Sequence, residues 1–409
     1  MPDPSPIVLA FSGGLDTSFC VPYLAEETGR PIYAVTVQTG GFSEDELEQI
    51  KRRALDLGAA SFAAVDAREA LWTRVLSYLV KGTVLRGNVY PLCVGPERVV
   101  QAEALVDEAV RVGATAVAHG STGAGNDQIR FDGALRLLAA GSGIDLEILT
   151  PIRTLGLSRE ATTEYLDARG IDVPAKTTAY SINRGLWGTT IGGQETHRTD
   201  GVLPESAWPD TASVADAPDE PLHLTLSFEN GLPVALDGEP IEPIALLEKL
   251  HRLGAEHGVG RGVHVGDTIL GIKGRVAFEA PAAAVLLPAH RELEKLVITR
   301  NQLVQVAESG DRYGRFLHEG HYFDPAMRDL EALLDSSQRR VTGEVDVRLF
   351  KGHAAVLGAR SPHSLFDAGA TYGETHELWD GRDAAGFAKL HGLQALLAAR
   401  AASQTTQSA

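Results

Sequence analysis

The feature that most constrains this chain is a glycine-rich segment close to its start, Ser12-Gly13-Gly14. It follows an apolar run at residues 6–10, which predicts a buried strand, and it precedes a stretch at residues 19–27 that predicts a helix. Glycines let the backbone approach an anion closely, and the unpaired N–H groups and dipole at a helix start favour negative charge. The sequence therefore predicts a phosphate-binding loop between a strand and a helix.

The polar residues of this loop limit the classes of phosphate-binding loop to which it can belong. Ser12, Thr17 and Ser18 add hydroxyl donors, whereas Asp16 is an anion beside a predicted anion site. Either a bound Mg²⁺ accounts for Asp16, or its side chain caps the turn. The chain has no G-x-x-x-x-G-K-[ST] motif, and the loop is not G-x-G-x-x-G. Its order, S-G-G-x-D-[ST]-S, resembles the pyrophosphate loop of ATP pyrophosphatases, which cleave ATP between the α- and β-phosphates.

Composition excludes several classes of protein. The 409 residues suffice for two or three domains, and the net charge of -17 argues against a nucleic-acid surface. We find no apolar run long enough to span a membrane and no secretory signal, so we expect a cytoplasmic protein. The two cysteines, Cys20 and Cys93, lie far apart and give no support for a disulfide, a zinc site or an iron–sulfur cluster.

Strand-like and helix-like stretches alternate up to about residue 170. This alternation predicts an α/β fold with a doubly wound parallel sheet, whose ligands lie at the carboxyl ends of the strands. Beyond that point the pattern becomes α+β, with hairpins near residues 222–236 and 341–357, strands at 263–272 and 276–287, and a helix at 293–308. We divide the chain into domains at residues 1–170 and 171–380, followed by a C-terminal helix and tail at 381–409.

A second glycine-rich turn follows the apolar residues 116–119 and would lie at the same sheet edge as the first. Among its glycines it carries Thr122, Asn126, Asp127 and Arg130. An Asn/Asp-rich turn that satisfies its own backbone would explain Asn126 and Asp127, but not Arg130. A guanidinium binds carboxylates in a bidentate manner, so Arg130 is a candidate for holding a substrate carboxylate.

Together with further segments, the two glycine-rich turns give the chain a resemblance to the argininosuccinate synthases over nearly its whole length. The matching segments, in the same order and at similar spacings, are residues 12–18, 90–92, 119–131, 180–181, 186–188, 217–221, 257–261, 271–273, 291–294, 341–343, 361–362 and 364–365. The resemblance implies a ligase that joins citrulline to aspartate, consumes ATP with Mg²⁺, and releases AMP and pyrophosphate. It also implies a homotetramer in which a C-terminal helix reaches across subunits.

The resemblance assigns site residues position by position. Asp16 and Asp127 are candidate catalytic residues. The implied ATP contacts are Ala10, Phe11, Ser12, Gly13, Gly14, Leu15, Asp16, Thr17, Ser18, Val37 and Gly120. The implied aspartate contacts are Thr122, Asn126 and Asp127, and the implied citrulline contacts are Tyr90, Asn126, Arg130, Ser181 and Thr190. No dedicated protein metal site is implied.

The chain departs from the family pattern chiefly on the citrulline side. Gly95 stands where a hydroxyl residue is usual, Gly266 where a glutamate is expected, and Phe278 where a tyrosine is expected. Further departures are Asn183 for aspartate, Ala124 for lysine, and a missing glutamate near Gly192. Either the pocket has re-formed, with Asp267 as a candidate partner for the citrulline amino group, or the substrate carries a modified amino group.

Two rival functions need features that the chain lacks, and a third leaves features of the chain unexplained. A tRNA-thiolating pyrophosphatase would need reactive cysteines and a basic surface. A glutamine-dependent amidating ligase would need a nucleophilic cysteine or an N-terminal domain for ammonia release. A nucleotide sensor on the same fold would need neither the second turn nor the second half of the chain.

Overall fold

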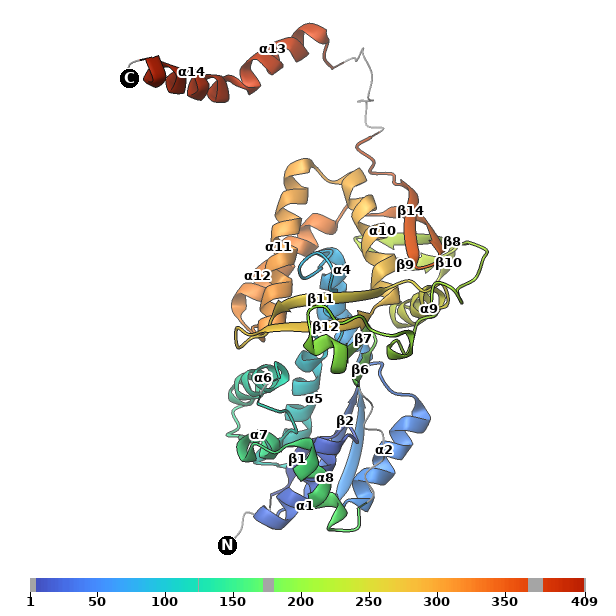
Figure 1. Cartoon of the computed structure of the whole chain (residues 1–409), viewed down its shortest axis with the longest axis vertical. Helices are drawn as coiled ribbons and strands as arrows, with labels where there is room; N and C mark the ends of the chain where they lie inside the picture. Colours follow the sequence, from blue (N-terminus) through green and yellow to red (C-terminus); the bar gives the residue numbers. More distant parts are fainter. Residues whose placement is uncertain (1–4, 124, 172–179, 367–377, 408–409) are drawn as a thin grey trace.

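The computed structural model describes residues 5–123, 125–171, 180–366 and 378–407. The first half is built on a parallel sheet in the order β3-β2-β1-β4-β5 (Figure 1). Its strands are β1 (Ile7–Ala10), β2 (Ile32–Gln38), β3 (Ser61–Asp66), β4 (Ala116–Ala118) and β5 (Glu147–Leu149).

Helices cover both faces of this sheet because successive strand residues point to opposite sides. Ile7 and Leu9 are buried in one apolar cluster, whereas Val8 is buried in another. The first cluster includes side chains of α1 (Leu15–Thr28), α2 (Glu44–Asp56) and α8 (Arg159–Asp167), and the second includes side chains of α5 (Glu97–Val112) and α6 (Asp127–Gly141). The predicted doubly wound α/β class is confirmed.

The second half is α+β, as predicted, and contains two antiparallel sheets. One has the order β11-β12-β7-β6 and the other the order β10-β9-β8-β13-β14. Their strands are β6 (Ser181–Gly185), β7 (Gly188–Gly192), β8 (Leu222–Glu229), β9 (Leu232–Leu236), β10 (Glu239–Pro240), β11 (Arg261–Asp267), β12 (Lys273–Glu279), β13 (Gly343–Phe350) and β14 (His353–Arg360). The helices packed with them are α9 (Pro243–Glu256), α10 (Pro281–Val297), α11 (Arg300–Glu319) and α12 (Pro325–Gln338).

The β6–β7 hairpin joins the two halves at the carboxyl end of β2. The Leu186 N–H donates to the Thr39 carbonyl at 2.8 Å. A Cβ on Gly40 would lie 2.8 Å from the Leu186 backbone, and one on Gly41 would lie 2.3 Å from the Arg184 carbonyl oxygen. Both positions therefore require glycine for the backbones to approach this closely. One buried apolar cluster continues from β1 through this junction to β13.

Two element boundaries in the second half differ from the sequence prediction. The strand expected at residues 276–287 ends at Glu279, because Pro281 begins α10, and the apolar run that suggested a longer strand is the buried start of this helix. The helix expected at residues 293–308 is divided between α10 and α11. Thr299 starts α11 by accepting a hydrogen bond from the Gln302 N–H in a capping box.

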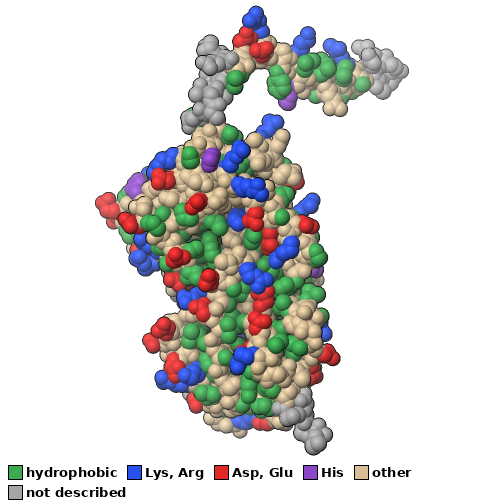
Figure 2. Space-filling model, turned by 180° about the vertical axis from the view of Figure 1, so that it is seen from behind, with side chains coloured by type: hydrophobic (Ala, Val, Ile, Leu, Met, Phe, Trp, Pro, Cys, Tyr) green, Lys and Arg blue, Asp and Glu red, His purple; other side chains and the backbone are tan. Residues whose placement is uncertain are grey.

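The C-terminal region forms two helices where one was expected, α13 (Gly381–His391) and α14 (Leu393–Gln407). They lie apart from the rest of the chain (Figure 1), and Figure 2 shows apolar side chains along them. Phe387, Leu390 and Leu397 are each more than half exposed. Among the described residues, no helix is long and apolar enough to cross a membrane.

Candidate active site

The first glycine-rich turn has the strand–turn–helix geometry that the sequence predicts. Gly13 has a φ of +73°, and Gly14 is the N-cap of α1 without a side-chain cap. The hydroxyls of Ser12 and Thr17 lie 3.3 Å apart, and Thr17 also donates to the Gly14 carbonyl at 3.3 Å. The start of α1 thus offers backbone N–H groups and hydroxyls to an anion.

The two glycine-rich turns meet, because β1 and β4 are neighbours in the sheet. A Cβ on Gly120 would lie 3.2 Å from the Thr17 methyl group and 3.3 Å from the Asp16 Cβ. Burial raises the pKa of Asp16, and the charge of Arg159 partly opposes this rise. Val37 lies in the neighbouring strand β2 and is buried. The predicted nucleotide contacts are therefore brought together at one sheet edge.

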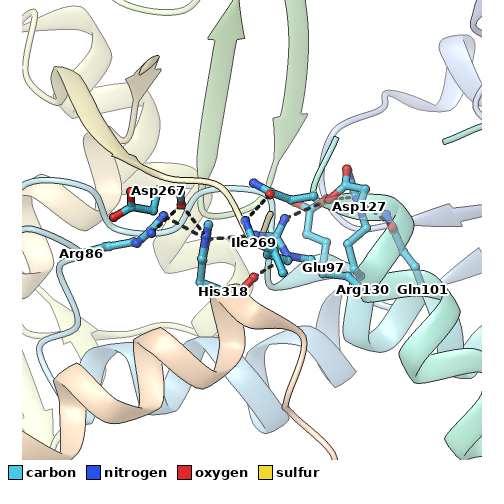
Figure 3. Close-up of polar contacts among 10 residues, drawn as sticks. Arg86, Glu97, Gln101, Asp127, Arg130, Asp267, Ile269 and His318 are labelled. Atoms are coloured by element: carbon cyan, nitrogen blue, oxygen red, sulfur yellow. Dashed lines mark hydrogen bonds and ion pairs between the residues drawn. The ribbon is translucent and has the colours of Figure 1, made fainter. Parts of the chain in front are cut away.

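The start of α6 carries the polar residues of the second turn. The Asn126 side-chain oxygen accepts from the Ile269 N–H at 2.9 Å, which ties this turn to the segment between β11 and β12. Asp127 accepts from Arg98 at 2.9 Å and from Arg130 at 3.0 Å (Figure 3). Although burial alone would raise it, these two guanidiniums lower the pKa of Asp127 to about 2. Asp127 is therefore an anion at neutral pH.

Arg130 is buried and bonded on all three of its nitrogens. Besides Asp127, it donates to the His318 carbonyl at 2.9 Å, and a second guanidinium nitrogen lies 3.0 Å from His318 Nδ1. Arg86 approaches the same Nδ1 at 3.2 Å (Figure 3). Burial, with the charges of Arg130 and Arg86, lowers the pKa of His318 to about 3, so the imidazole is neutral.

The other predicted citrulline contacts come from the segment after α4 (Ser77–Lys81) and from the β6–β7 hairpin. Tyr90 is buried, with its ring centroid 5.6 Å from that of His264 and 5.2 Å from that of Phe278. Thr190 lies opposite Phe278 in the sheet and is also buried. Ser181 begins β6 and is exposed, as is Thr122 in the second turn. Tyr90 and Thr190 therefore flank Phe278, whereas Ser181 lies at the edge of this group.

The glycines that replace expected polar residues make room for other side chains. A Cβ on Gly95 would lie 3.3 Å from the Arg130 guanidinium carbon. A Cβ on Gly266 would lie 2.5 Å from His264 Nε2. The ring of His264 thus fills the space that a side chain at position 266 would need.

The carboxylate of Asp267, the candidate partner for the citrulline amino group, points away from the cluster. It pairs with Lys273 at 2.7 Å, and both side chains are more than half exposed. Only its backbone carbonyl contacts the cluster, where it accepts from Arg86 at 2.7 Å and lies 3.2 Å from His318 Nε2.

We therefore expect Asp267→Asn to change citrulline binding by less than about fivefold, since exposed ion pairs contribute at most about 1 kcal/mol. Paired saturation curves for citrulline and aspartate on wild type and variant measure this. A selective loss of citrulline affinity would restore Asp267 as the partner of the amino group.

Four residues of this cluster were missed by sequence reasoning: Arg86, Glu97, Arg98 and His318. Glu97 and Arg98 stand in the first turn of α5, close in sequence to Tyr90, and a charged pair at the start of a helix with a buried face could have drawn attention to them. Arg86 and His318 lie more than two hundred residues apart, and no local pattern signals their contact.

Comparison with known proteins assigns the chain to a family. Residues 6–172 match the family model described as the arginosuccinate synthase N-terminal HUP domain, and residues 180–398 match the C-terminal domain of the same enzyme. The chain belongs to the argininosuccinate synthase family.

Curated argininosuccinate synthases resemble the chain over nearly its whole length. The protein from Xanthomonas axonopodis pv. citri is 42% identical over 407 residues, covering 96% of this chain and 94% of its own. The argininosuccinate synthase of Methanocaldococcus jannaschii is 38% identical, with 95% and 97% covered, and that of Pyrococcus furiosus is 37% identical, with 96% and 94% covered.

Proposed function

We propose that this chain is an ATP-dependent ligase that condenses citrulline with aspartate to argininosuccinate, releasing AMP and pyrophosphate. The observation that carries this function is the contact between the two glycine-rich turns at Gly120. From Gly120 the second turn continues through Asn126 and Asp127 to Arg130, which pairs with Asp127. Membership of the argininosuccinate synthase family supports citrulline rather than a modified ureido substrate.

The proposed reaction has two steps. The ureido oxygen of citrulline attacks the α-phosphorus of ATP, the bond to the β-phosphate oxygen breaks, and pyrophosphate leaves. The amine of aspartate then attacks the ureido carbon of the citrullyl-adenylate, AMP leaves with the former ureido oxygen, and the amine loses a proton. Positioning and charge stabilisation supply most of the catalysis in such transfers. In the first step the N–H groups at the start of α1 and the hydroxyls of Ser12 and Thr17 stabilise the departing pyrophosphate.

Mg²⁺ fits the first turn as a companion of ATP. Magnesium in nucleotide sites is usually held by one or two carboxylates together with phosphate oxygens, and Asp16 offers such a carboxylate. The metal would neutralise phosphate charge.

The amino acids are assigned to the second turn and its neighbours. Thr122, Asn126 and Asp127 would receive aspartate. Citrulline would contact Tyr90, Asn126, Arg130, Ser181 and Thr190. Asp127 has two guanidinium partners, Arg98 and Arg130, so it would orient Arg130 in the proposed site.

We infer a cytoplasmic homotetramer from the family resemblance, and the exposed apolar residues of the C-terminal helices support contact between copies of the chain. Phe387, Leu390 and Leu397 need cover from water, and a neighbouring copy of the chain would supply it. The proposed domains are residues 1–170 and 171–380, with the C-terminal segment at 381–409 making the contact between subunits.

Chromatography of the reaction products tests the function. We expect AMP and pyrophosphate, formed continuously only when citrulline and aspartate are both present. Gly13→Val should abolish turnover, because Gly13 has a positive φ and a Cβ there would lie 3.2 Å from Ile50. Formation of ADP and phosphate, or turnover independent of citrulline, would overturn the proposal.

A further inference from the structure

His119 is buried at the start of the second glycine-rich turn, and both of its ring nitrogens have partners. The Ser121 N–H lies 3.3 Å from Nδ1 and can only donate, so Nδ1 accepts and the ring proton is assigned to Nε2. Nε2 then donates to Asp132 of α6 at 3.0 Å. The ring also stacks on Phe131, with 5.4 Å between the ring centroids. His119 is therefore held in one orientation, in which it fixes the backbone of Ser121.

The hydrogen bonds continue from Asp132 and return to the turn at a second point. The other carboxylate oxygen of Asp132 accepts from Arg153 at 2.9 Å, and Arg153 also donates to the Gln128 side-chain oxygen at 3.1 Å. The Gln128 side-chain nitrogen donates to the Gly123 carbonyl. Although burial would raise it, the hydrogen bonds from His119 and Arg153 lower the pKa of Asp132, so an anion joins these two donors. We call the four side chains that connect Ser121 to Gly123 the hydrogen-bond chain: His119, Asp132, Arg153 and Gln128.

The two backbone groups that this hydrogen-bond chain holds lie on either side of Thr122. Thr122 itself is exposed, and its carbonyl accepts from the Gly125 N–H within the same turn at 3.4 Å. Because glycines leave the backbone of such a turn many conformations, a fixed position for the Thr122 hydroxyl requires support from outside the turn. The bonds to Ser121 and Gly123 give that support to the residues immediately before and after Thr122.

We propose that the hydrogen-bond chain positions Thr122 for the aspartate that attacks the adenylated intermediate. This inference rests on the proposed function, which assigns Thr122 to aspartate. The four side chains act through the backbone of residues 121–123 and need not touch the substrate. Their effect falls on the second step, where a reacting group displaced by about 1 Å can lose on the order of 100-fold in rate.

The nucleotide side of the same turn is held by other contacts. The His119 N–H donates to the Leu149 carbonyl at 3.0 Å, so the backbone just before Gly120 is bonded to the neighbouring strand β5. A Cβ on Gly120 would lie 3.2 Å from the Thr17 methyl group, so Gly120 packs directly on the pyrophosphate loop. Loss of the hydrogen-bond chain should therefore leave the first step, attack on ATP by citrulline, nearly unchanged.

Steady-state kinetics of the full-length protein test this role. His119→Phe keeps an aromatic ring beside Phe131 but offers no acceptor to the Ser121 N–H, and we expect it to raise the KM for aspartate at least tenfold. In His119→Asn the side-chain oxygen can accept from the N–H two residues further on, as in an Asx turn, so this variant should recover part of the loss. Gln128→Met should also raise the KM, because it removes the donor to the Gly123 carbonyl.

A separate measurement of the first step distinguishes positioning from a general loss of structure. Citrulline-dependent exchange of labelled pyrophosphate into ATP needs no aspartate, and it should stay within threefold of wild type in all three variants. Thr150→Val is the matched control, because it removes a buried hydroxyl that lies 3.2 Å from the Thr154 hydroxyl, close in sequence to Arg153 but outside the hydrogen-bond chain. It should change neither the exchange rate nor the KM for aspartate.

Two results would overturn the positioning role: an unchanged KM for aspartate in His119→Phe, or an exchange rate that falls as much as overall turnover. If wild type forms no argininosuccinate, the proposed function fails, and calorimetric titration with aspartate still decides the positioning role. A Kd raised at least tenfold in His119→Phe would then support it, and an unchanged Kd would overturn it. If wild type does not bind aspartate, both proposals fail.

Discussion

Arg130→Lys is expected to lower both citrulline affinity and protein stability. The guanidinium makes three directed contacts, to Asp127, the His318 carbonyl and His318 Nδ1, and an ammonium cannot reproduce this planar arrangement. Sequence reasoning alone would predict a loss of about 1–3 kcal/mol in binding with little change in stability. The buried contacts change that expectation, because leaving the His318 acceptors unpaired costs about 1–3 kcal/mol in stability as well.

Thermal unfolding and citrulline saturation curves measure the two effects. Arg136→Lys is the control, since Arg136 lies on the same helix with its side chain exposed, and it should leave both quantities unchanged. If Arg130→Lys keeps the wild-type melting temperature, the bonds to His318 do not stabilise the folded protein. If it keeps the citrulline affinity, Arg130 does not hold the substrate.

The wild-type protein is expected to lose stability as the pH rises, and the substitution Glu97→Gln is expected to abolish this loss. Glu97 is 3% exposed, one of its carboxyl oxygens accepts from Thr39 at 2.9 Å, and the other has no hydrogen-bond partner among the described residues. Burial raises the pKa of Glu97 to about 8, against the opposing effects of Arg98 and Thr39. A Cβ on Gly185 would lie 1.5 Å from the unpartnered oxygen, so the group has little room to escape.

The sign follows from proton binding. The pKa of Glu97 is raised in the folded state, so the folded protein keeps a proton that the unfolded chain has lost between about pH 4.5 and about pH 8. The stabilisation is complete below this range and is lost as the pH rises through it. Between about pH 6 and about pH 9 the wild type should lose on the order of 3 kcal/mol of unfolding free energy that Glu97→Gln retains.

Denaturant unfolding at a series of pH values measures this difference. Glu103→Gln serves as the control on the same helix, since Glu103 is partly exposed and pairs with Arg74. It should follow the wild-type pH dependence. Parallel pH profiles for wild type and Glu97→Gln would show that Glu97 does not titrate in this range.

The first half of the fold could be predicted because its strands are local apolar runs separated by glycine-rich turns. The contact between the two turns followed from the parallel sheet, since neighbouring strands end at the same edge. By contrast, the sequence predicts a turn where α6 begins, because the first residues of this helix are polar and belong to the candidate site. The β6–β7 hairpin was missed because its strands are short, polar and rich in glycine.

The citrulline side of the site could be predicted only in outline. Tyr90 and Arg130 were recognised from local motifs, but their partners His264 and His318 come from β11 and α11. A sequence pattern reports which face of an element is apolar, and it does not report which distant polar groups meet. Asp267 illustrates the limit: it lies beside Gly266 in sequence, but its side chain points to the opposite side of the strand.

The position of α4 (Ser77–Lys81) has a consequence for synthesis on the ribosome. Its buried residues Leu79 and Val80 pack in the cluster that α10, α11 and α12 complete, and Lys81 pairs with Asp335 of α12 at 2.6 Å. These three helices are translated about two hundred residues after α4. The nascent first half must therefore emerge with an uncovered apolar surface, and its vulnerability to aggregation ends only when the second half has been made.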